Sequence, residues 1–194
     1  MISSILHFDE VVLLEMNSII GRFAWLDKII DILAVYLIYS IPIILLSVWF
    51  YSRYTKKAAL QLTFSAFLPW LLFNKLFPAF IWYRPRPYTA NIGVKELVFH
   101  RPDYSFPSDH ATVLMALTLA AWLMGYKKLG WALFTITIII SCSRVVIGVH
   151  YPLDIIGGWV AGTVGALIIY WLREPLTKYV YNPIIKIATK IKLA

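Results

Sequence analysis

Five apolar runs, each close to the length of a membrane-spanning helix, constrain this chain more than any other feature. They cover residues 29–51, 58–82, 110–126, 129–148 and 153–172. A helix needs about 20 residues to cross the hydrocarbon core, where the backbone must satisfy its own hydrogen bonds. Because 60% of the 194 residues are hydrophobic, an ordinary soluble domain is excluded. We predict an all-α integral membrane protein with a bundle of about five transmembrane helices over residues 28–173.

The two ends of the chain differ from these runs. Residues 1–27 contain Asp9, Glu10 and Glu15, which stand too close together for a spanning helix, so we expect an amphipathic helix lying at the membrane interface. Residues 174–194 space lysines among isoleucines, which predicts a basic cytoplasmic tail along the anionic inner leaflet. Residues 1–194 are then expected to form a single membrane-embedded domain.

The charge pattern predicts an orientation. The net charge is +8, but the basic residues are scattered between apolar runs, which argues against nucleic acid as a partner. If five helices alternate, the basic residues at 53–57, at 127–128 and from 173 onward share one face, which should be cytoplasmic. Nine of the ten acidic residues fall on the opposite face. The lone Cys142 excludes an internal disulfide and is expected to be a small buried residue.

The stretch 143–154 places costly polar side chains in apolar sequence. Arg144 closes one apolar run, and Pro152 suits the first turn of the next helix. His150 and Asp154 are four residues apart, so one helical turn can bring the carboxylate to one imidazole nitrogen. The other nitrogen would remain oriented and electron-rich. This pattern predicts a histidine nucleophile.

Two further clusters are expected to meet this stretch. The segment 105–110 precedes one apolar run, and Arg84-Pro-Arg86-Pro ends another. We expect Ser108 to cap the following helix, so that N–H groups at Asp109 and His110 point at an anion. Arg86 with Arg144 would donate forked hydrogen bonds to phosphate oxygens. The constellation favours phosphoryl transfer, which needs positive charge, a nucleophile and an acid.

The motifs resemble those of a known family. Ser-Arg, five residues, His, three residues and Asp in 143–154, together with Pro-Ser-Asp-His at 107–110, are similar to signatures of the type 2 phosphatidic acid phosphatase superfamily. That family includes membrane lipid phosphatases and vanadium haloperoxidases. The resemblance implies that His150 attacks phosphorus to form a phosphohistidine and that Asp154 orients it. It also implies that His110 protonates the leaving oxygen and then activates water, without a metal or other cofactor.

The first motif of the family places a lysine seven residues before an Arg-Pro pair, and no lysine stands at that distance before Arg84 or Arg86. Lys75 lies one helical turn before Ala79, which is the residue seven positions before Arg86. It would either reach the phosphate or pair with another group of the bundle. Arg84 and Arg101 are the other candidates to supply the missing positive charge.

In the second motif Asp109 replaces the usual glycine. Its carboxylate suits a helix N-terminus but opposes a bound phosphate, so it should either point away or bind a substrate hydroxyl or a cation. A metal site built from His110, His150 and Asp154 is a chemical alternative. The surrounding arginines favour an anion instead.

The compact length and the segments Pro-Arg-Pro-Tyr and Ser-Phe-Pro-Ser-Asp-His look most like bacterial undecaprenyl-diphosphatases of the bacitracin-resistance type, which recycle the cell-wall carrier lipid. This resemblance implies hydrolysis of a polyprenyl diphosphate in the bacterial cytoplasmic membrane, with the site on the outer face. A phosphatase acting on phosphatidylglycerophosphate, phosphatidic acid or lipid A is the close alternative. A vanadate haloperoxidase is another, against which the apolar runs count.

A non-enzymatic lipid binder or transporter is the remaining alternative, although binding alone needs no paired acid and nucleophile. The expected partners are a phosphorylated lipid and membrane lipids. The spacing Gly158-x-x-x-Gly162 favours packing within the bundle over dimerisation, and nothing else in the sequence indicates an oligomer.

Overall fold

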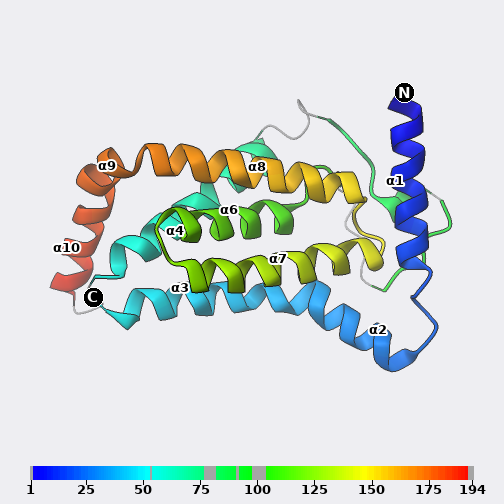
Figure 1. Cartoon of the computed structure of the whole chain (residues 1–194), viewed down its shortest axis with the longest axis horizontal. Coiled ribbons are helices and arrows are strands. Elements are labelled where there is room, and N and C mark those ends of the chain that lie inside the picture. Colours follow the sequence, from blue (N-terminus) through cyan, green and yellow to red (C-terminus); the bar gives the residue numbers. More distant parts are fainter. Residues whose placement is uncertain (1, 53, 77–81, 91, 98–103, 192–194) are drawn as a thin grey trace.

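Helices form the regular structure of this protein. The computed structural model describes residues 2–52, 54–76, 82–90, 92–97 and 104–191, and over these residues it has no strand beyond one isolated bridge between Pro85 and Tyr104. The long helices run lengthwise side by side in Figure 1, which confirms the predicted all-α bundle. The α-helices are α1 (Ile2–Asn17), α2 (Ala24–Asp31), α3 (Ser40–Tyr51), α4 (Lys56–Pro69), α6 (Asp109–Leu123), α7 (Lys127–Val146), α8 (Pro152–Trp171), α9 (Arg173–Leu176) and α10 (Asn182–Lys190).

Over the described residues, three helices are long and apolar enough to cross a membrane: Ala24–Tyr51, Lys127–Val146 and Pro152–Trp171. The first joins α2 to α3 through a π-helical segment (Ile32–Tyr36) and a short 3₁₀ turn (Leu37–Tyr39). It begins at Ala24, whereas the interfacial segment was predicted to extend to residue 27. Asp27 lies in its first turn, where an acidic group suits the helix dipole and accepts the N–H of Gly21 at 3.1 Å. The length and apolar composition of the three helices fit a location in a membrane.

Helix α6 is the central helix of the bundle. Its 15 residues span only about 22 Å, less than the hydrocarbon core. Helices α4, α7 and α8 all pack against it. Because neighbouring helices cover α6, its length need not match the lipid. Its buried leucines, Leu114 and Leu117, join Leu62 of α4 and Leu133 of α7 in the main apolar core.

Two glycines let α8 approach α6 closely. A Cβ atom added at Gly158 would lie 2.8 Å from the carbonyl oxygen of Ser108. One added at Gly162 would meet the carbonyl oxygen of Thr112. Both residues face α6, so their spacing serves packing within the bundle, as predicted.

The outward sides of α7 and α8 carry apolar side chains. Trp131 on α7 and Val160 on α8 are exposed, as suits helices that face lipid. Cys142 is also exposed, so the expectation of a buried cysteine was wrong. An apolar run in a membrane helix supplies both its packed side and its lipid side, and the run alone does not tell them apart.

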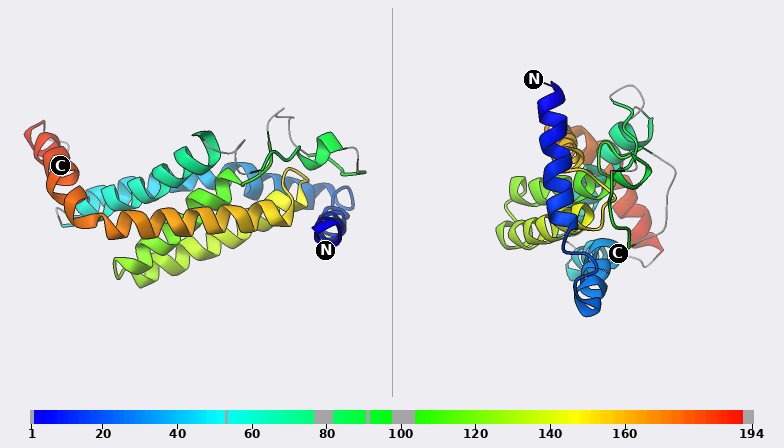
Figure 2. Two further views of the ribbon diagram at one scale, coloured as in Figure 1. Left: turned by 90° about the horizontal axis from the view of Figure 1, so that it is seen from above. Right: turned by 90° about the vertical axis from the view of Figure 1, so that its right-hand side faces the viewer.

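The two ends of the chain cover opposite ends of the bundle. Helix α1 stands across the bundle axis at one end, whereas α9 and α10 fold over the other (Figures 1 and 2). One face of α1 is buried through Asp9, Leu13 and Asn17. The opposite face exposes apolar side chains such as Phe8 and Val11.

Candidate active site

The predicted motifs meet at the end of the bundle that α1 covers. A cavity of about 360 Å³ lies there, and Arg86, His110 and Arg144 all line it. These residues come from the loop after α4, the start of α6 and the last turn of α7. The first spanning helix supplies another wall through Tyr36 and Tyr39, which no motif in the sequence indicated. The complete lining is Asp31, Val35, Tyr36, Ile38, Tyr39, Arg86, Tyr88, Leu97, His110, Arg144 and Val149.

The partners of His150 fix its tautomer. Its Nδ1 atom lies 2.9 Å from the backbone carbonyl oxygen of Ser105, and its Nε2 atom lies 3.3 Å from a guanidinium nitrogen of Arg86. A carbonyl can only accept and a guanidinium can only donate, so Nδ1 carries the proton and Nε2 presents its lone pair. The Nε2 atom thus faces an arginine of the cavity wall. It is the nitrogen that can attack an electrophile.

Burial favours the neutral form of this ring. His150 lies between α7 and α8 with 2% of its surface exposed, and burial together with the nearby Arg144 and Arg86 lowers its pKa from 6.5 to about 4. Asp154 opposes this shift. At neutral pH the imidazole is therefore uncharged, as a nucleophile must be.

Asp154 supports His150 less directly than predicted. Its Oδ2 atom is 3.6 Å from Nδ1 of His150, within ion-pair range but farther than the carbonyl of Ser105. The same Oδ2 atom accepts the backbone N–H of Tyr151 at 2.8 Å, and Oδ1 accepts from Arg84 at 3.1 Å. Asp154 therefore holds the turn that carries His150 as well as its ring. The closest partner of Nδ1 is a backbone carbonyl, which no sequence motif specifies.

Arg84 is engaged by two carboxylates. It pairs with Asp154 and, at 2.6 Å, with Asp9 of α1, and it stacks 3.4 Å above the ring centre of Tyr151. All of these side chains are buried. Arg84 does not line the cavity, whereas Arg86 does. Arg84 therefore holds Asp154 and helix α1 in place instead of facing the cavity.

Helix α1 was not predicted to touch the site, yet it contacts the first turn of α8, the end of α7 and the loop that contains Lys95. Asp9 also accepts the backbone N–H of Leu153 at 2.9 Å. Asn17 donates to the carbonyls of Lys95 and Val146 and accepts the N–H of Lys95. The spacing of Asp9, Leu13 and Asn17, one helical turn apart, was the available signal for a buried face.

Ser108 begins α6, as predicted, but its side chain does not cap the helix. Its hydroxyl is buried without a hydrogen-bond partner in the described part of the chain. The expectation of a side-chain cap was therefore wrong. Instead the backbone N–H of Ser108 donates to the carbonyl of Asp154 at 3.0 Å, which ties the second motif to the third.

Lys75 and Asp109 form an ion pair of 3.1 Å with each other. Both side chains are partly exposed, and neither lines the cavity. This geometry matches the alternative in which Lys75 pairs with a bundle group and Asp109 points away from the phosphate. Arg101, the other candidate cation, lies outside the described residues.

The alternative metal site lacks the required grouping. In the ranges that the structure describes, no three His, Cys, Asp or Glu side chains are gathered as metal ligands. The oxygens of Asp154 are directed at Arg84 and a backbone N–H. The cavity instead presents guanidinium groups, which suit an anion.

Comparison with known proteins identifies the family. The model of the PAP2 superfamily matches residues 58–178. The undecaprenyl-diphosphatase BcrC of Bacillus subtilis is 29% identical over 171 residues, covering 85% of this chain and 87% of that protein. YbjG of Escherichia coli is 34% identical over 148 residues, covering 74% of this chain and 71% of that protein.

A solved structure has the same fold. LpxE of Aquifex aeolicus matches with a TM-score of 0.66 at 24% identity, over 81% of this chain and 92% of that chain. The family model covers more than half of the sequence and includes all three motifs, so the chain belongs to the PAP2 superfamily.

Proposed function

We propose that this membrane phosphatase hydrolyses the terminal phosphate of a polyprenyl diphosphate, with undecaprenyl diphosphate as the natural substrate class. One observation carries the proposal: a neutral His150 presents Nε2 to Arg86 at the wall of a cavity that also contains Arg144 and His110. The name of the relative BcrC supports the diphosphate substrate. Its similarity extends over most of both chains.

The chemistry follows from these positions. Arg86 and Arg144 bind the oxygens of the terminal phosphate, and Arg86 shifts from the imidazole to the substrate as the phosphate enters. Nε2 of His150 forms a bond to phosphorus while the bond from phosphorus to the bridging oxygen breaks. His110 gives a proton to the leaving oxygen and then removes one from the water that cleaves the phosphohistidine. The scheme requires no metal, because the two arginines supply the positive charge.

The proposal includes an arrangement in the membrane. Residues 1–194 form one domain in which five segments cross the bilayer. Three of them are the long apolar helices described above, and α4 and α6 are the other two. Helix α1 lies in the outer interface, and its exposed apolar face supports this placement. The active site faces outward, and the basic residues 174–194 lie at the cytoplasmic surface.

A comparison of substrates tests the function. Purified protein should release phosphate from a polyprenyl diphosphate, and His150→Ala should abolish the release because it removes the Nε2 lone pair that faces Arg86. His7→Ala, which alters an exposed histidine on α1, is the matched control and should keep full activity. Near-normal turnover by the His150 variant would rule out the mechanism.

His110 distinguishes a diphosphatase from a monophosphatase. Cleavage of a diphosphate expels a stable lipid monophosphate, whereas cleavage of phosphatidic acid expels a basic alkoxide that needs a proton. General acid catalysis is worth about 10² to 10⁴ in rate. His110→Ala should therefore lower kcat/KM by a much larger factor on phosphatidic acid than on the diphosphate. Wild-type preference for the monophosphate would favour the alternative function.

A further inference from the structure

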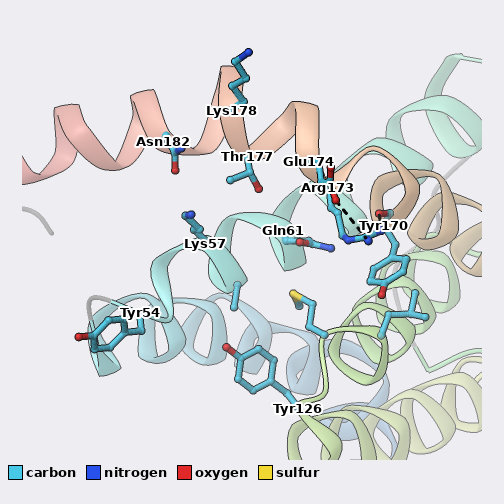
Figure 3. Close-up of a pocket in the computed structure, with 13 residues that line it drawn as sticks. Tyr54, Lys57, Gln61, Tyr126, Tyr170, Arg173, Glu174, Thr177, Lys178 and Asn182 are labelled. Carbon is cyan, nitrogen blue, oxygen red and sulfur yellow. Dashed lines mark hydrogen bonds and ion pairs between the residues drawn. The ribbon is translucent and has the colours of Figure 1, made fainter.

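A second cavity lies at the other end of the bundle. Its volume is about 570 Å³, and its walls come from α4, the turn between α6 and α7, the end of α8, and α9 to α10 (Figure 3). Helix α8 runs from the active-site end to this end, and its 20 residues, which rise about 1.5 Å each, make it about 30 Å long. The two cavities have no lining residue in common. This cavity is therefore a separate feature of the fold.

The lining of the second cavity is cationic. Lys57, Arg173 and Lys178 contribute positive charges, and Glu174 is the one carboxylate among the lining residues. The side chain of Glu174 is 86% exposed and lies 3.9 Å from Arg173, so it offsets this charge only weakly. Figure 3 shows Lys57 and Asn182 reaching toward each other from facing helices, whereas Lys178 points outward. The chemistry of the lining suits an anion.

Gln61 provides an independent indication of a ligand. It lines the cavity one helical turn after Lys57, and only 8% of its surface is exposed. Its Nε2 atom is buried and has no hydrogen-bond partner among the described residues. Figure 3 shows its carboxamide directed toward Arg173. A buried donor without an acceptor is costly, and an anionic oxygen between Gln61 and Arg173 would satisfy it.

An apolar groove adjoins the cationic cavity. It has a volume of about 340 Å³ and is lined by Ile44, Val48, Tyr51 and Leu129 among others. Tyr126 lines both the groove and the cavity, so the two meet at this residue. A small soluble anion would use the cavity alone. An amphiphile with an anionic head and an apolar chain would use both.

We propose that this composite site binds one anionic phospholipid from the leaflet opposite the active site. Lys57, Gln61 and Arg173 donate hydrogen bonds to its headgroup phosphate, and one acyl chain lies in the groove past Tyr126. Charge complementarity favours a lipid with a net negative head over a zwitterionic one. The bound lipid would join α4 to the α9–α10 segment, which supply the facing donors.

Lipid retention by purified protein tests this site. Native mass spectrometry in detergent should show one phosphatidylglycerol bound to the wild type in preference to phosphatidylcholine. Loss of one hydrogen bond to a charged group corresponds to about a tenfold loss of affinity or more. Lys57→Gln and Gln61→Glu should each cause at least that loss, and the second also brings a carboxylate to the phosphate.

The control is Lys186→Gln, which removes the same charge from an exposed position on α10 outside the cavity. It should leave phosphatidylglycerol retention unchanged. Phosphate-release activity equal to wild type verifies that each variant is folded. Equal losses for Lys57→Gln and Lys186→Gln would show unspecific attraction to anionic lipid and overturn the proposal. Displacement of the lipid by millimolar inorganic phosphate would overturn it too, in favour of a soluble anion.

Discussion

At the scale of single residues, the site depends on one backbone carbonyl as much as on its motif side chains. The carbonyl of Ser105 fixes the proton of His150 on Nδ1, and Arg86 faces the lone pair on Nε2. Asp154 shares its oxygens among His150, Arg84 and a backbone N–H. The proposed nucleophile is thus oriented by several contacts, and its charge is controlled by burial.

The titration of His150 checks this description. Since burial lowers its pKa to about 4, the ring should remain neutral in the folded protein at pH 5. In ¹⁵N-histidine NMR spectra, the imidazole signal that disappears in His150→Gln should keep the shifts of a neutral ring down to that pH. A signal that titrates near the ordinary value of 6.5 would contradict the assignment. The unfolded chain binds this proton more readily between pH 6.5 and 4, so the folded state loses stability as the pH falls through that range.

At the scale of elements, the helices were predictable where composition alone decides them. The run 129–148 became α7 (Lys127–Val146), and the run 153–172 became α8 (Pro152–Trp171) with Pro152 in its first turn. Their apolar length and a helix-starting proline are local signals. The long predicted run 58–82 instead divides at Pro69, where α4 ends and a π-helical segment (Trp70–Leu76) begins.

What composition could not supply were contacts between distant segments. Three acidic residues stand in the first 15 residues, and nothing in the local sequence shows that Asp9 is the one of these three that pairs with Arg84. Similarly, the pairing of Lys75 with Asp109 joins residues 34 positions apart. The motif histidines and arginines were found because their spacing is characteristic. The residues that hold these side chains in place are brought to them by the packing of distant segments, and a single sequence does not reveal this packing.

Helix α1 is expected to act on catalysis through Asp9. Asp9→Asn would keep an acceptor for the N–H of Leu153 but would turn amide hydrogens toward Arg84, which would then draw Asp154 away from His150. We expect kcat to fall about tenfold, equivalent to ~1.4 kcal/mol in the activation barrier. KM should change little, because Asp9 does not line the cavity.

The matched control on the same helix is Glu15→Gln, which removes a carboxylate at an exposed position. It should leave both kcat and KM at wild-type values. A parallel rise in KM for Asp9→Asn would indicate that α1 shapes substrate binding. Unchanged kinetics would remove α1 from the mechanism.

At the scale of the whole molecule, the two cavities lie at opposite ends of one polarised bundle. The active-site end carries Asp9, Asp31 and Asp154, whereas the other end carries Lys57, Arg173 and Lys178. Basic residues remain on the cytoplasmic side during membrane insertion. From this asymmetry we expect the phosphatase site to face outward. The proposed phospholipid site would then lie in the inner leaflet, where anionic lipids attract basic segments.

Cysteine labelling in intact cells tests this orientation. Cys142 is first replaced by alanine, because it is exposed and is the one cysteine in the sequence. A cysteine at Glu96, which is exposed in the loop beside the active site, should react with a membrane-impermeant thiol reagent. A cysteine at Lys127, exposed at the start of α7 at the other end, should react only after the cells are opened. The reverse pattern would place the active site in the cytoplasm. It would exclude the hydrolysis of a carrier lipid on the outer face, while leaving the geometry of His150 and its arginines as a lipid phosphatase site acting on the inner leaflet.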